Sequence, residues 1–324
     1  MPKLKRSTAS ERSSIRRRLA LAGLALFLAV DLALVVTALN RPGPPSTEEG
    51  RPSPPPTAPI ATPESGVDDA PSETITTTQP LRILEASDGQ LAWRATTGPC
   101  GAQATPEISV DAGATWRATS ATDPTGVVSL QSIVIEGQQV ASMVGQDSVD
   151  CTPTLVRTYV SGDNYAEYPS DLADAWYVNP LDHATIHGPA GDSAAPCANV
   201  VAFAQRTDLD ASVLCGDGTV HVTVDGLLNW TAVPLKAGAM NIAVTGEGYT
   251  VVRVGDSACA GVRLEALMVL PGTPPQIVSG PCIEIPQDPE SLAGQVALAE
   301  GGDTLWLWAG ETLVRSVDGG LTWE

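Results

Sequence analysis

Basic side chains are scarce in this sequence of 324 residues, which contains 18 Lys and Arg against 37 Asp and Glu and has a net charge of −19 at pH 7. Seven of the basic residues lie within the first 18 positions. Residues 40–324 therefore hold only 11 basic residues against 35 acidic ones, a net charge of −24. Nucleic-acid phosphates are bound by Lys and Arg, so this composition excludes nucleic acid as a partner.

Histidine and the common catalytic motifs are also scarce. The three histidines are His183, His187 and His221, and the sequence has no HExxH, GxSxG or phosphate-binding glycine motif. His183 and His187 share the segment HATIH, but no third metal ligand follows at a recognisable spacing. We therefore predict no metal, no cofactor and no catalytic residue, which favours a protein that is not an enzyme.

One long apolar run lies near the N-terminus, at residues 19–39. As a helix it spans about 31 Å, which matches a bilayer core of roughly 30 Å. The basic residues precede it, so the positive-inside rule places the N-terminus in the cytoplasm. We predict a basic cytoplasmic tail over residues 1–18, a single-pass transmembrane helix over residues 19–39, and an extracytoplasmic remainder. A cleaved signal peptide is the alternative.

Asp31 lies almost at the middle of this apolar run. An acid there costs about 3 kcal/mol on the insertion scale, which the surrounding Leu, Phe and Val residues outweigh. Asp31 either faces a polar group of a partner helix or is a lone acid that is protonated or locally hydrated.

Proline is concentrated after the apolar run, since residues 40–80 hold 11 of the 27 prolines. Such a composition favours polyproline II with a reach of roughly 3 Å per residue. We predict a Pro-rich linker over residues 40–72, with a recognition motif as the alternative to a spacer. Residues 73–324 then form an extracytoplasmic domain, and the hydrophobic content of 43% suffices for a sizeable core.

Within that domain an apolar strand, a short turn and a second strand recur five times. The second strand of each copy ends in glycine, at Gly98, Gly145, Gly216, Gly255 and Gly310. β-Branched or alternating residues bounded by Gly, Asp or Asn predict strands throughout, with no helix longer than about two turns.

An eight-residue pattern, S-x-D-x-G-x-T-W, follows the third strand of several copies. It is complete at residues 109–116 and 316–323, and partial at residues 161–168 and 223–230. Ser or Thr and Asp can accept the N–H groups of a turn, Gly supplies a positive φ, and the aromatic ring packs back over the hairpin. The predicted turn residues are Ser109, Asp111, Gly113, Trp116, Ser161, Asp163, Thr223, Asp225, Trp230, Ser316, Asp318, Gly320 and Trp323.

These segments resemble the Asp-box, or BNR, repeat of a β-propeller family that includes sialidases, sortilin-type receptors and photosystem II stability/assembly factor-like proteins. The resemblance implies an all-β fold in the sialidase-like superfamily, and a membrane-anchored bacterial member of it. Together with a degenerate turn at residues 271–275, the spacing predicts a β-propeller of about five four-stranded blades, preceded by the transmembrane helix. The resemblance also implies that the box aspartates shape turns and do not act as catalytic acids or calcium ligands.

Sialidases of this family use an arginine triad, a Tyr/Glu nucleophile pair and an early Phe-Arg-Ile-Pro motif. The nearest segment here, PLRIL at residues 80–84, lacks the Phe and the following Pro. We therefore expect a membrane-tethered, non-catalytic binding or scaffold module for an envelope protein or a glycan ligand. A divergent sialidase-like glycoside hydrolase is the alternative.

Six cysteines lie in the segment predicted to be exported, which favours disulfides over metal-bound or free thiols. In the propeller that the resemblance implies, all six lie on the face opposite the Asp boxes. We predict the pairs Cys100–Cys151, Cys197–Cys215 and Cys259–Cys282.

The longest segment without a strand pattern, residues 169–198, is predicted to be a loop on the same face. Its candidate ligand-binding residues are Trp176, Tyr177, Asp182, His183 and His187, which would form an aromatic and acidic rim. The alternative is that Trp176 and Tyr177 only anchor the loop on the blades.

The last box ends one residue before the end of the sequence, so blade five is expected to lack a fourth strand. An open strand edge must be covered, and residues 73–79 are rich in β-branched residues. We predict that residues 74–78 pair antiparallel with residues 312–316 and close the ring.

Overall fold

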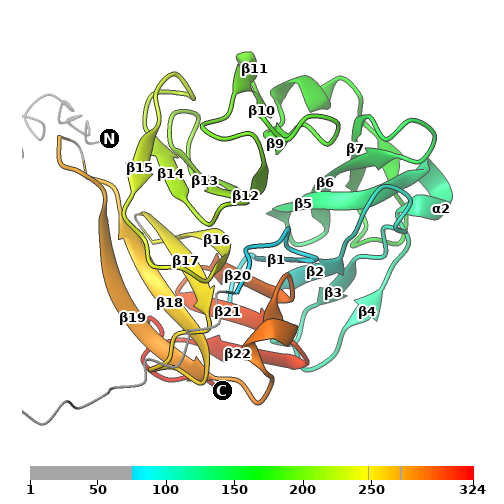
Figure 1. The fold of residues 1–324 in the computed structure, drawn as a ribbon. Helices are drawn as coiled ribbons and strands as arrows, with labels where there is room; N and C mark the ends of the chain where they lie inside the picture. The colour runs from blue at the N-terminus through cyan, green and yellow to red at the C-terminus, as the bar shows by residue number, and fades with distance from the viewer. Residues whose placement is uncertain (1–74, 247, 271) are drawn as a thin grey trace, which may run out of the picture. The chain divides into compact units, whose positions relative to one another are not determined.

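A computed structural model describes residues 75–324, apart from residues 247 and 271. The predicted cytoplasmic tail, transmembrane helix and linker lie outside the described residues. Within the described part of the chain, no helix is long and apolar enough to cross a membrane. The strands form six sheets around a central axis, so the fold is a β-propeller (Figure 1).

We number the sheets as blades 1 to 6 in chain order, and within each blade consecutive strands pair antiparallel. Blade 1 contains β1 (Arg82–Ala86), β2 (Ala92–Thr96), β3 (Glu107–Ser109) and β4 (Arg117–Ala118). Blade 2 contains β5 (Val127–Gly137), β6 (Val140–Asp147), β7 (Pro153–Thr158) and β8 (Ala166–Glu167). Blade 3 contains β9 (Tyr177–Val178), β10 (Thr185–Gly188) and β11 (Gly191–Ala194).

Blade 4 contains β12 (Val200–Gln205), β13 (Ala211–Cys215), β14 (Val220–Thr223) and β15 (Thr231–Val233). Blade 5 contains β16 (Ala239–Thr245), β17 (Gly248–Val254), β18 (Gly261–Met268) and β19 (Gln276–Glu284). Blade 6 contains β20 (Val296–Gly301), β21 (Thr304–Ala309) and β22 (Thr312–Ser316). Three short helical turns join strands: α2 (Thr122–Thr125), η1 (Asp171–Asp174) and η2 (Pro289–Leu292).

The expectation of five blades is wrong, because the structure has six. The additional blade 3 lies within residues 169–198, which were expected to be an irregular loop. Its strands are only two to four residues long, and β10 (TIHG) and β11 (GDSA) contain few β-branched or aromatic residues. Such segments carry almost no periodic signal, so this blade is defined by pairing that sequence patterns do not reveal.

A separate hydrophobic cluster fills each of the six interfaces between neighbouring blades. The largest lies between blades 1 and 2 and includes the fully buried Trp93 and Met143. The smallest lies between blades 2 and 3, where only Val144, Leu155 and Tyr177 are buried. Burial on both faces explains why the second strands β13 and β17 are buried along their whole length.

The strands β1, β5, β12, β16 and β20 lie on the inside of the ring (Figure 1). We call the end of the ring where these strands begin the upper face, and the opposite end the lower face. Since paired strands alternate in direction, loops between second and third strands lie on the upper face. Turns between third and fourth strands, which include the box turns, lie on the lower face.

The three disulfides have the predicted pairing, and all of them lie at the upper face. Cys100–Cys151 joins the loops after β2 and β6, with a Cα–Cα distance of 5.9 Å, and so links blades 1 and 2. Cys197–Cys215 joins the entry to β12 with the end of β13 at 6.2 Å. Cys259–Cys282 joins the loop after β17 with β19 at 5.6 Å.

The first strand of blade 3, β9, runs in the opposite direction to the inner strands of the other blades. The backbone N–H of Val200, at the start of β12, donates to the carbonyl oxygen of His183 at 3.1 Å, in the turn between β9 and β10. That turn therefore lies at the upper face, and β9 runs towards it. β9 thus has the direction of a second strand, and residues of both η1 and β9 face the inside of the ring.

The predicted ring closure is wrong for its described residues 75–78, because β22 pairs with β21 and not with them. Instead, the Thr77 hydroxyl donates to the carbonyl oxygen of Ala239 at 2.9 Å, which places this segment beside β16. The edge of β22 is met by Glu324, whose backbone exchanges two hydrogen bonds with Arg315, each 2.9 Å long.

Side chains join blade 6 to blade 1. The Arg82 guanidinium lies 4.1 Å from the ring centre of Trp308, and Arg94 lies between Trp308 and Trp116, at 4.9 and 4.1 Å. Such contacts contribute about 0.5 to 2 kcal/mol each, depending on desolvation. The Trp306 indole N–H also donates across the interface to a carbonyl oxygen in the β1–β2 turn. Ring closure therefore needs no shared strand.

Candidate functional site

The two complete box patterns form the same lower-face turn. In the first, Gly113 N–H donates to the Ser109 hydroxyl at 2.9 Å, and Asp111 accepts from the backbone and hydroxyl of Thr115 at 2.9 and 2.6 Å. The Trp116 indole N–H donates back to the Gly113 carbonyl oxygen at 3.1 Å. The second turn, from Ser316 to Trp323, repeats these four bonds at 2.8, 2.9, 2.7 and 3.0 Å.

These hydrogen bonds stabilise the charged form of the box carboxylates. The Thr322 hydroxyl and backbone N–H lower the pKa of Asp318 to about 2, and the equivalent bonds from Thr115 lower the pKa of Asp111. In the partial box at residues 223–230, Asn229 stands at the Thr position and lowers the pKa of Asp225 in the same way. Each carboxylate is thus engaged by its own turn, as a structural role requires.

The partial box of blade 2 begins three residues earlier than the sequence pattern predicts. Positive φ angles at Ala112 (63°) and Gly113 (80°) mark the first box, and the equivalent pair here is Ser161 (55°) and Gly162 (87°). Gly162 N–H donates to the hydroxyl of Thr158 at 2.8 Å, so Thr158 takes the place of the box Ser.

Two consequences follow for the residues predicted in this box. Val160 stands at the aspartate position, and the buried Tyr165 stands at the Trp position with its hydroxyl 2.7 Å from that of Thr119. Asp163 instead forms an ion pair with Arg117 at 2.9 Å. The sequence pattern indicated the wrong register because Val160 stands where the turn carboxylate is expected, while Ser161 and Asp163 have the separation of the Ser and Asp in the pattern.

The predicted ligand-binding residues lie in and beside blade 3, with Tyr177 in β9, His187 in β10 and Trp176 directly before β9. Tyr177 is buried and stacks on His187 with ring centres 4.6 Å apart. His187 Nδ1 lies 2.6 Å from Asp192 Oδ1, and His187 Nε2 lies 3.3 Å from the Ala173 carbonyl oxygen. Trp176 stacks on Phe203 of β12 at 6.1 Å.

The remaining two residues lie in the turn between β9 and β10. Asp182 accepts from the Thr185 hydroxyl at 2.7 Å and from Ala184 N–H at 3.2 Å, which lowers its pKa. His183 Nδ1 lies 3.1 Å from Asn199 Oδ1. Of the five predicted residues, Trp176, Tyr177 and His183 line the central cavity, whereas Asp182 and His187 do not.

The central cavity has a volume of about 800 Å³ and is enclosed by the inner strands of blades 1, 2, 4, 5 and 6. At blade 3 its wall is completed by residues of η1 and by residues 175–178. Its volume is within the range of sites that hold small organic ligands, roughly 300 to 1,000 Å³. It combines aliphatic side chains with amides, hydroxyls and the aromatic residues Trp176, Tyr177 and Phe203.

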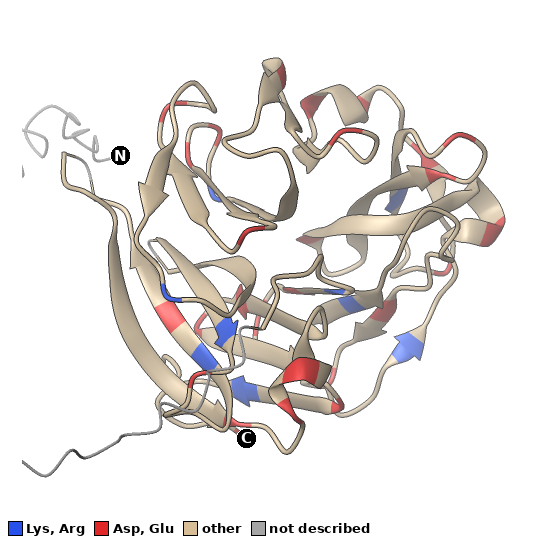
Figure 2. Cartoon of the chain, in the orientation of Figure 1, with Lys and Arg blue, Asp and Glu red and all other residues tan. Residues whose placement is uncertain are grey.

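Acidic groups outnumber basic groups on the cavity wall. The charged residues that line it are Arg82, Arg157, Glu85, Asp171, Asp174 and Glu300, four carboxylic acids against two arginines. Both arginines are already engaged: Arg82 with Gln295 and Gly310, and Arg157 with Asp171 at 2.8 Å and Glu136 at 3.1 Å. Figure 2 shows the wider pattern, in which the few basic residues are distributed over several blades.

Glu85 is the exceptional acid of this cavity. It lies in β1, lines the cavity, and has no hydrogen-bond or ion-pair partner among the residues that the structure describes. The walls leave its carboxylate only partly accessible to water, and this desolvation raises its pKa to about 7. Sequence analysis missed Glu85 because an acid alternating with apolar residues in RILEA is typical of any half-buried strand.

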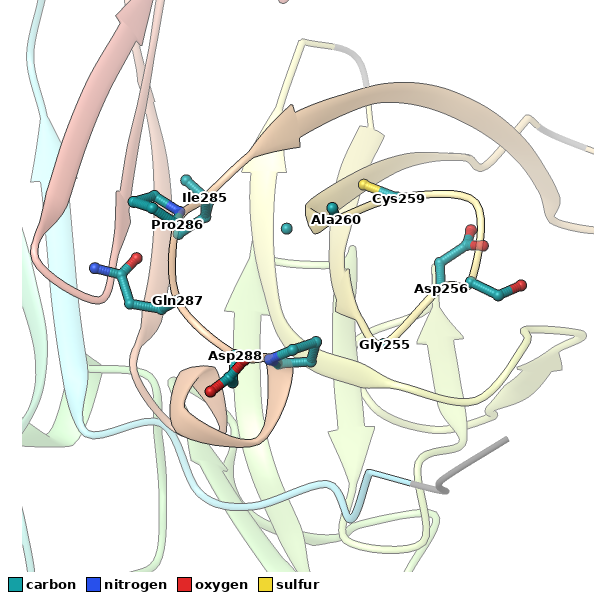
Figure 3. A pocket seen from close by; sticks show the side chains of 11 residues that line it. Gly255, Asp256, Cys259, Ala260, Ile285, Pro286, Gln287 and Asp288 are labelled. Carbon is teal, nitrogen blue, oxygen red and sulfur yellow. The ribbon is translucent and has the colours of Figure 1, made fainter. Parts of the chain in front are cut away.

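A second, smaller cavity of about 460 Å³ lies at the upper face, between the loop after β17 and the segment that follows β19 (Figure 3). Asp256, Cys259, Gln287 and Asp288 are among its lining residues. Asp256 is already paired with Arg263 at 2.6 Å, and Cys259 is in a disulfide. Gln287 Oε1, in contrast, is buried and has no hydrogen-bond partner among the described residues.

The arginines of the described chain do not form an anion-binding cluster. Each of the eight contacts a carboxylate or a carbonyl oxygen of the protein: Arg82, Arg94, Arg117, Arg157, Arg206, Arg253, Arg263 and Arg315. Most of these partners lie on the same blade as the arginine, and the two arginines of blade 5, Arg253 and Arg263, share the carboxylate of Asp256.

A scan against protein-family models found no match, and a search of curated proteins found no similar sequence. Among solved structures, YCF48 from Cyanidioschyzon merolae is similar, with a TM-score of 0.41, 14% identity, and coverage of 78% of this chain and 85% of that one. PorZ from Porphyromonas gingivalis gives a TM-score of 0.40 and 13% identity, with coverage of 78% of this chain and 38% of that one. An ancestral GH74 enzyme gives a TM-score of 0.42 and 9% identity, with coverage of 76% of this chain and 45% of that one.

Proposed function

We propose that this protein is a membrane-anchored, non-catalytic β-propeller that binds a ligand of the cell envelope in its central cavity. The observation that carries the proposal is the cavity itself, which is about 800 Å³ in volume and is lined by aromatic, amide and acidic side chains from all six blades. Concave sites of this size with a few convergent polar groups are the usual places for ligands.

The charged groups support binding without catalysis. A sialidase-like hydrolase needs arginines free to hold a carboxylated sugar, and each of the eight described arginines has a partner within the protein. The carboxylates of Asp111, Asp225 and Asp318 are held in lower-face turns. Turnover of a fluorogenic sialoside by the full-length protein would overturn this part of the proposal.

An extracytoplasmic location is supported by three disulfides in the propeller, because disulfides persist in oxidising compartments. The apolar run at residues 19–39, preceded by basic residues, supports the membrane anchor and its orientation. A C-terminal tag that is cleaved by protease added to intact cells would agree with this orientation, and a tag protected until lysis would contradict it.

A blocking substitution tests whether the cavity binds ligands. Ala202 of β12 lines the cavity, so Ala202→Trp should fill part of it, while Ala232→Trp on the exposed outer strand β15 is the matched control. The probes are phenethylamine, 2-phenylethanol and 3-phenylpropionate, which share a phenyl ring but differ in charge. We expect calorimetry to show that at least one probe binds the wild type and the control but not Ala202→Trp. Binding of no probe, or binding that survives the block, would refute the proposal.

A further inference from the structure

We infer that the central cavity selects an organic ammonium group and that Glu85 is the counter-ion that binds it. This inference rests on the proposed binding role of the cavity. It adds the chemical class of the ligand and the residue that recognises it.

The first argument is the charge of the wall. Four carboxylates and two arginines line the cavity, and both arginines already bind other groups of the protein. A concave site lined by charges of one sign focuses their field. A cation is therefore stabilised in this cavity, whereas an anion is repelled and finds no free guanidinium.

The second argument is that Glu85 differs from the other acids. Asp171 is paired with Arg157, Glu300 accepts a hydrogen bond from Gly246 N–H, and Asp174 is exposed to solvent. Glu85 has neither a partner among the described residues nor full hydration. Carboxylates in such surroundings are usually paired or hydrogen-bonded, so an incoming ammonium supplies the partner that the protein lacks.

The third argument concerns the uncharged part of the ligand. Trp176, Tyr177 and Phe203 line the same cavity, together with aliphatic side chains of the inner strands. Aromatic faces attract cations and also bury apolar groups. The fitting ligand is thus an ammonium group attached to a compact apolar body, either as a free amine or as the side chain of a lysine.

Binding of an ammonium group must release a proton from Glu85 when the carboxyl is protonated beforehand. Because its pKa is raised to about 7, affinity should rise about tenfold between pH 6 and pH 8 as the carboxylate forms. The other charged or titratable groups on the wall are Arg82, Arg157, Asp171, Asp174, Glu300 and His183. Because several of these groups face the same cavity, Glu85→Gln is needed to assign the dependence to Glu85.

The test compares the three phenyl probes by calorimetry on the full-length protein. We expect phenethylamine to bind more tightly than 2-phenylethanol, and 3-phenylpropionate to bind most weakly. Glu85→Gln should weaken phenethylamine binding about tenfold or more, as expected for loss of a charge-assisted hydrogen bond, and should abolish the rise with pH. Glu167→Gln, on the exposed strand β8, is the matched control and should bind like the wild type.

The outcomes separate this inference from the proposed function. If a neutral or anionic probe binds in the cavity and phenethylamine does not, the cavity binds ligands but the ammonium assignment is wrong. The inference also fails if Glu85→Gln binds phenethylamine like the wild type, with circular dichroism showing that the variant is folded. A blocked, acetylated and amidated Phe-Lys peptide distinguishes the two sources of the ammonium: tighter binding than phenethylamine indicates a lysine side chain, and weaker binding a free amine.

Discussion

Replacing Glu85 with Gln isolates the contribution of one carboxyl group to the pH dependence of folding. Desolvation in the central cavity raises the pKa of Glu85 from 4.5 to about 7 in the folded protein. Between these two values the native state holds a proton that the unfolded chain has released. The free energy of unfolding therefore falls as the pH rises, by about 1.4 kcal/mol per pH unit.

The magnitude follows from the size of the shift. A difference of about 2.5 pH units corresponds to about 3 kcal/mol, which is fully present below pH 4.5 and is lost as the pH rises through 7. Gln has nearly the same shape and no charge to desolvate. Relative to the wild type, Glu85→Gln should therefore gain about 3 kcal/mol of stability between pH 5 and pH 8.

The assay is urea unfolding of the full-length protein, followed by tryptophan fluorescence with the disulfides intact, at pH 5, 6, 7 and 8. Glu167→Gln serves as the control, since this exposed glutamate lies outside the cavity. Its stability curve should run parallel to that of the wild type. If the Glu85→Gln curve also runs parallel to the wild type, the Glu85 carboxylate is hydrated or paired in solution and the reasoning is refuted.

Three further predictions concern the scaffold. Replacing both Cys100 and Cys151 with Ser should lower stability by about 2 to 5 kcal/mol in chemical denaturation, because this bridge closes a loop of 51 residues between blades 1 and 2; an unchanged midpoint would contradict it. Thr158→Val should lower the free energy of unfolding by about 1 to 3 kcal/mol, because it leaves turn N–H groups unsatisfied. Asp163→Asn should lower it by less than about 1 kcal/mol. A larger loss for Asp163→Asn than for Thr158→Val would support the register that the sequence pattern indicated. Trp308→Ala should cost about 3 to 5 kcal/mol, since its ring contacts two guanidinium groups at the junction of blades 6 and 1; a melting temperature close to that of the wild type would show that the junction is held by other contacts.

The features that could be predicted from the sequence are those in which the deciding interactions are local. A box turn such as residues 109–116 is held by hydrogen bonds between residues two to four positions apart, so its eight letters determine its shape. The disulfide pairs were predictable for a related reason: once the strands are placed in blades, each cysteine has a partner in its own blade or in the adjacent one. The all-β propeller architecture followed from the repetition of these units.

The features that could not be predicted depend on contacts between distant segments. Blade 3 has short strands of weakly patterned residues, and they are strands because β9 and β10 pack between blades 2 and 4. The closing junction depends on Arg82 meeting Trp308, more than 200 positions away. In the box of blade 2, the register follows from the burial of Tyr165 beside Thr119, and not from the positions of Ser161 and Asp163.

Glu85 shows the same division within a single residue. The sequence RILEA determines a strand in which an acid alternates with apolar residues, and it would do so in many folds. Only the ring decides that this strand is an inner one, that its acid lines the central cavity, and that the two arginines of the cavity wall are bound to other groups. Local sequence sets backbone conformation, but the solvation and the pairing of a charge depend on every wall that surrounds it.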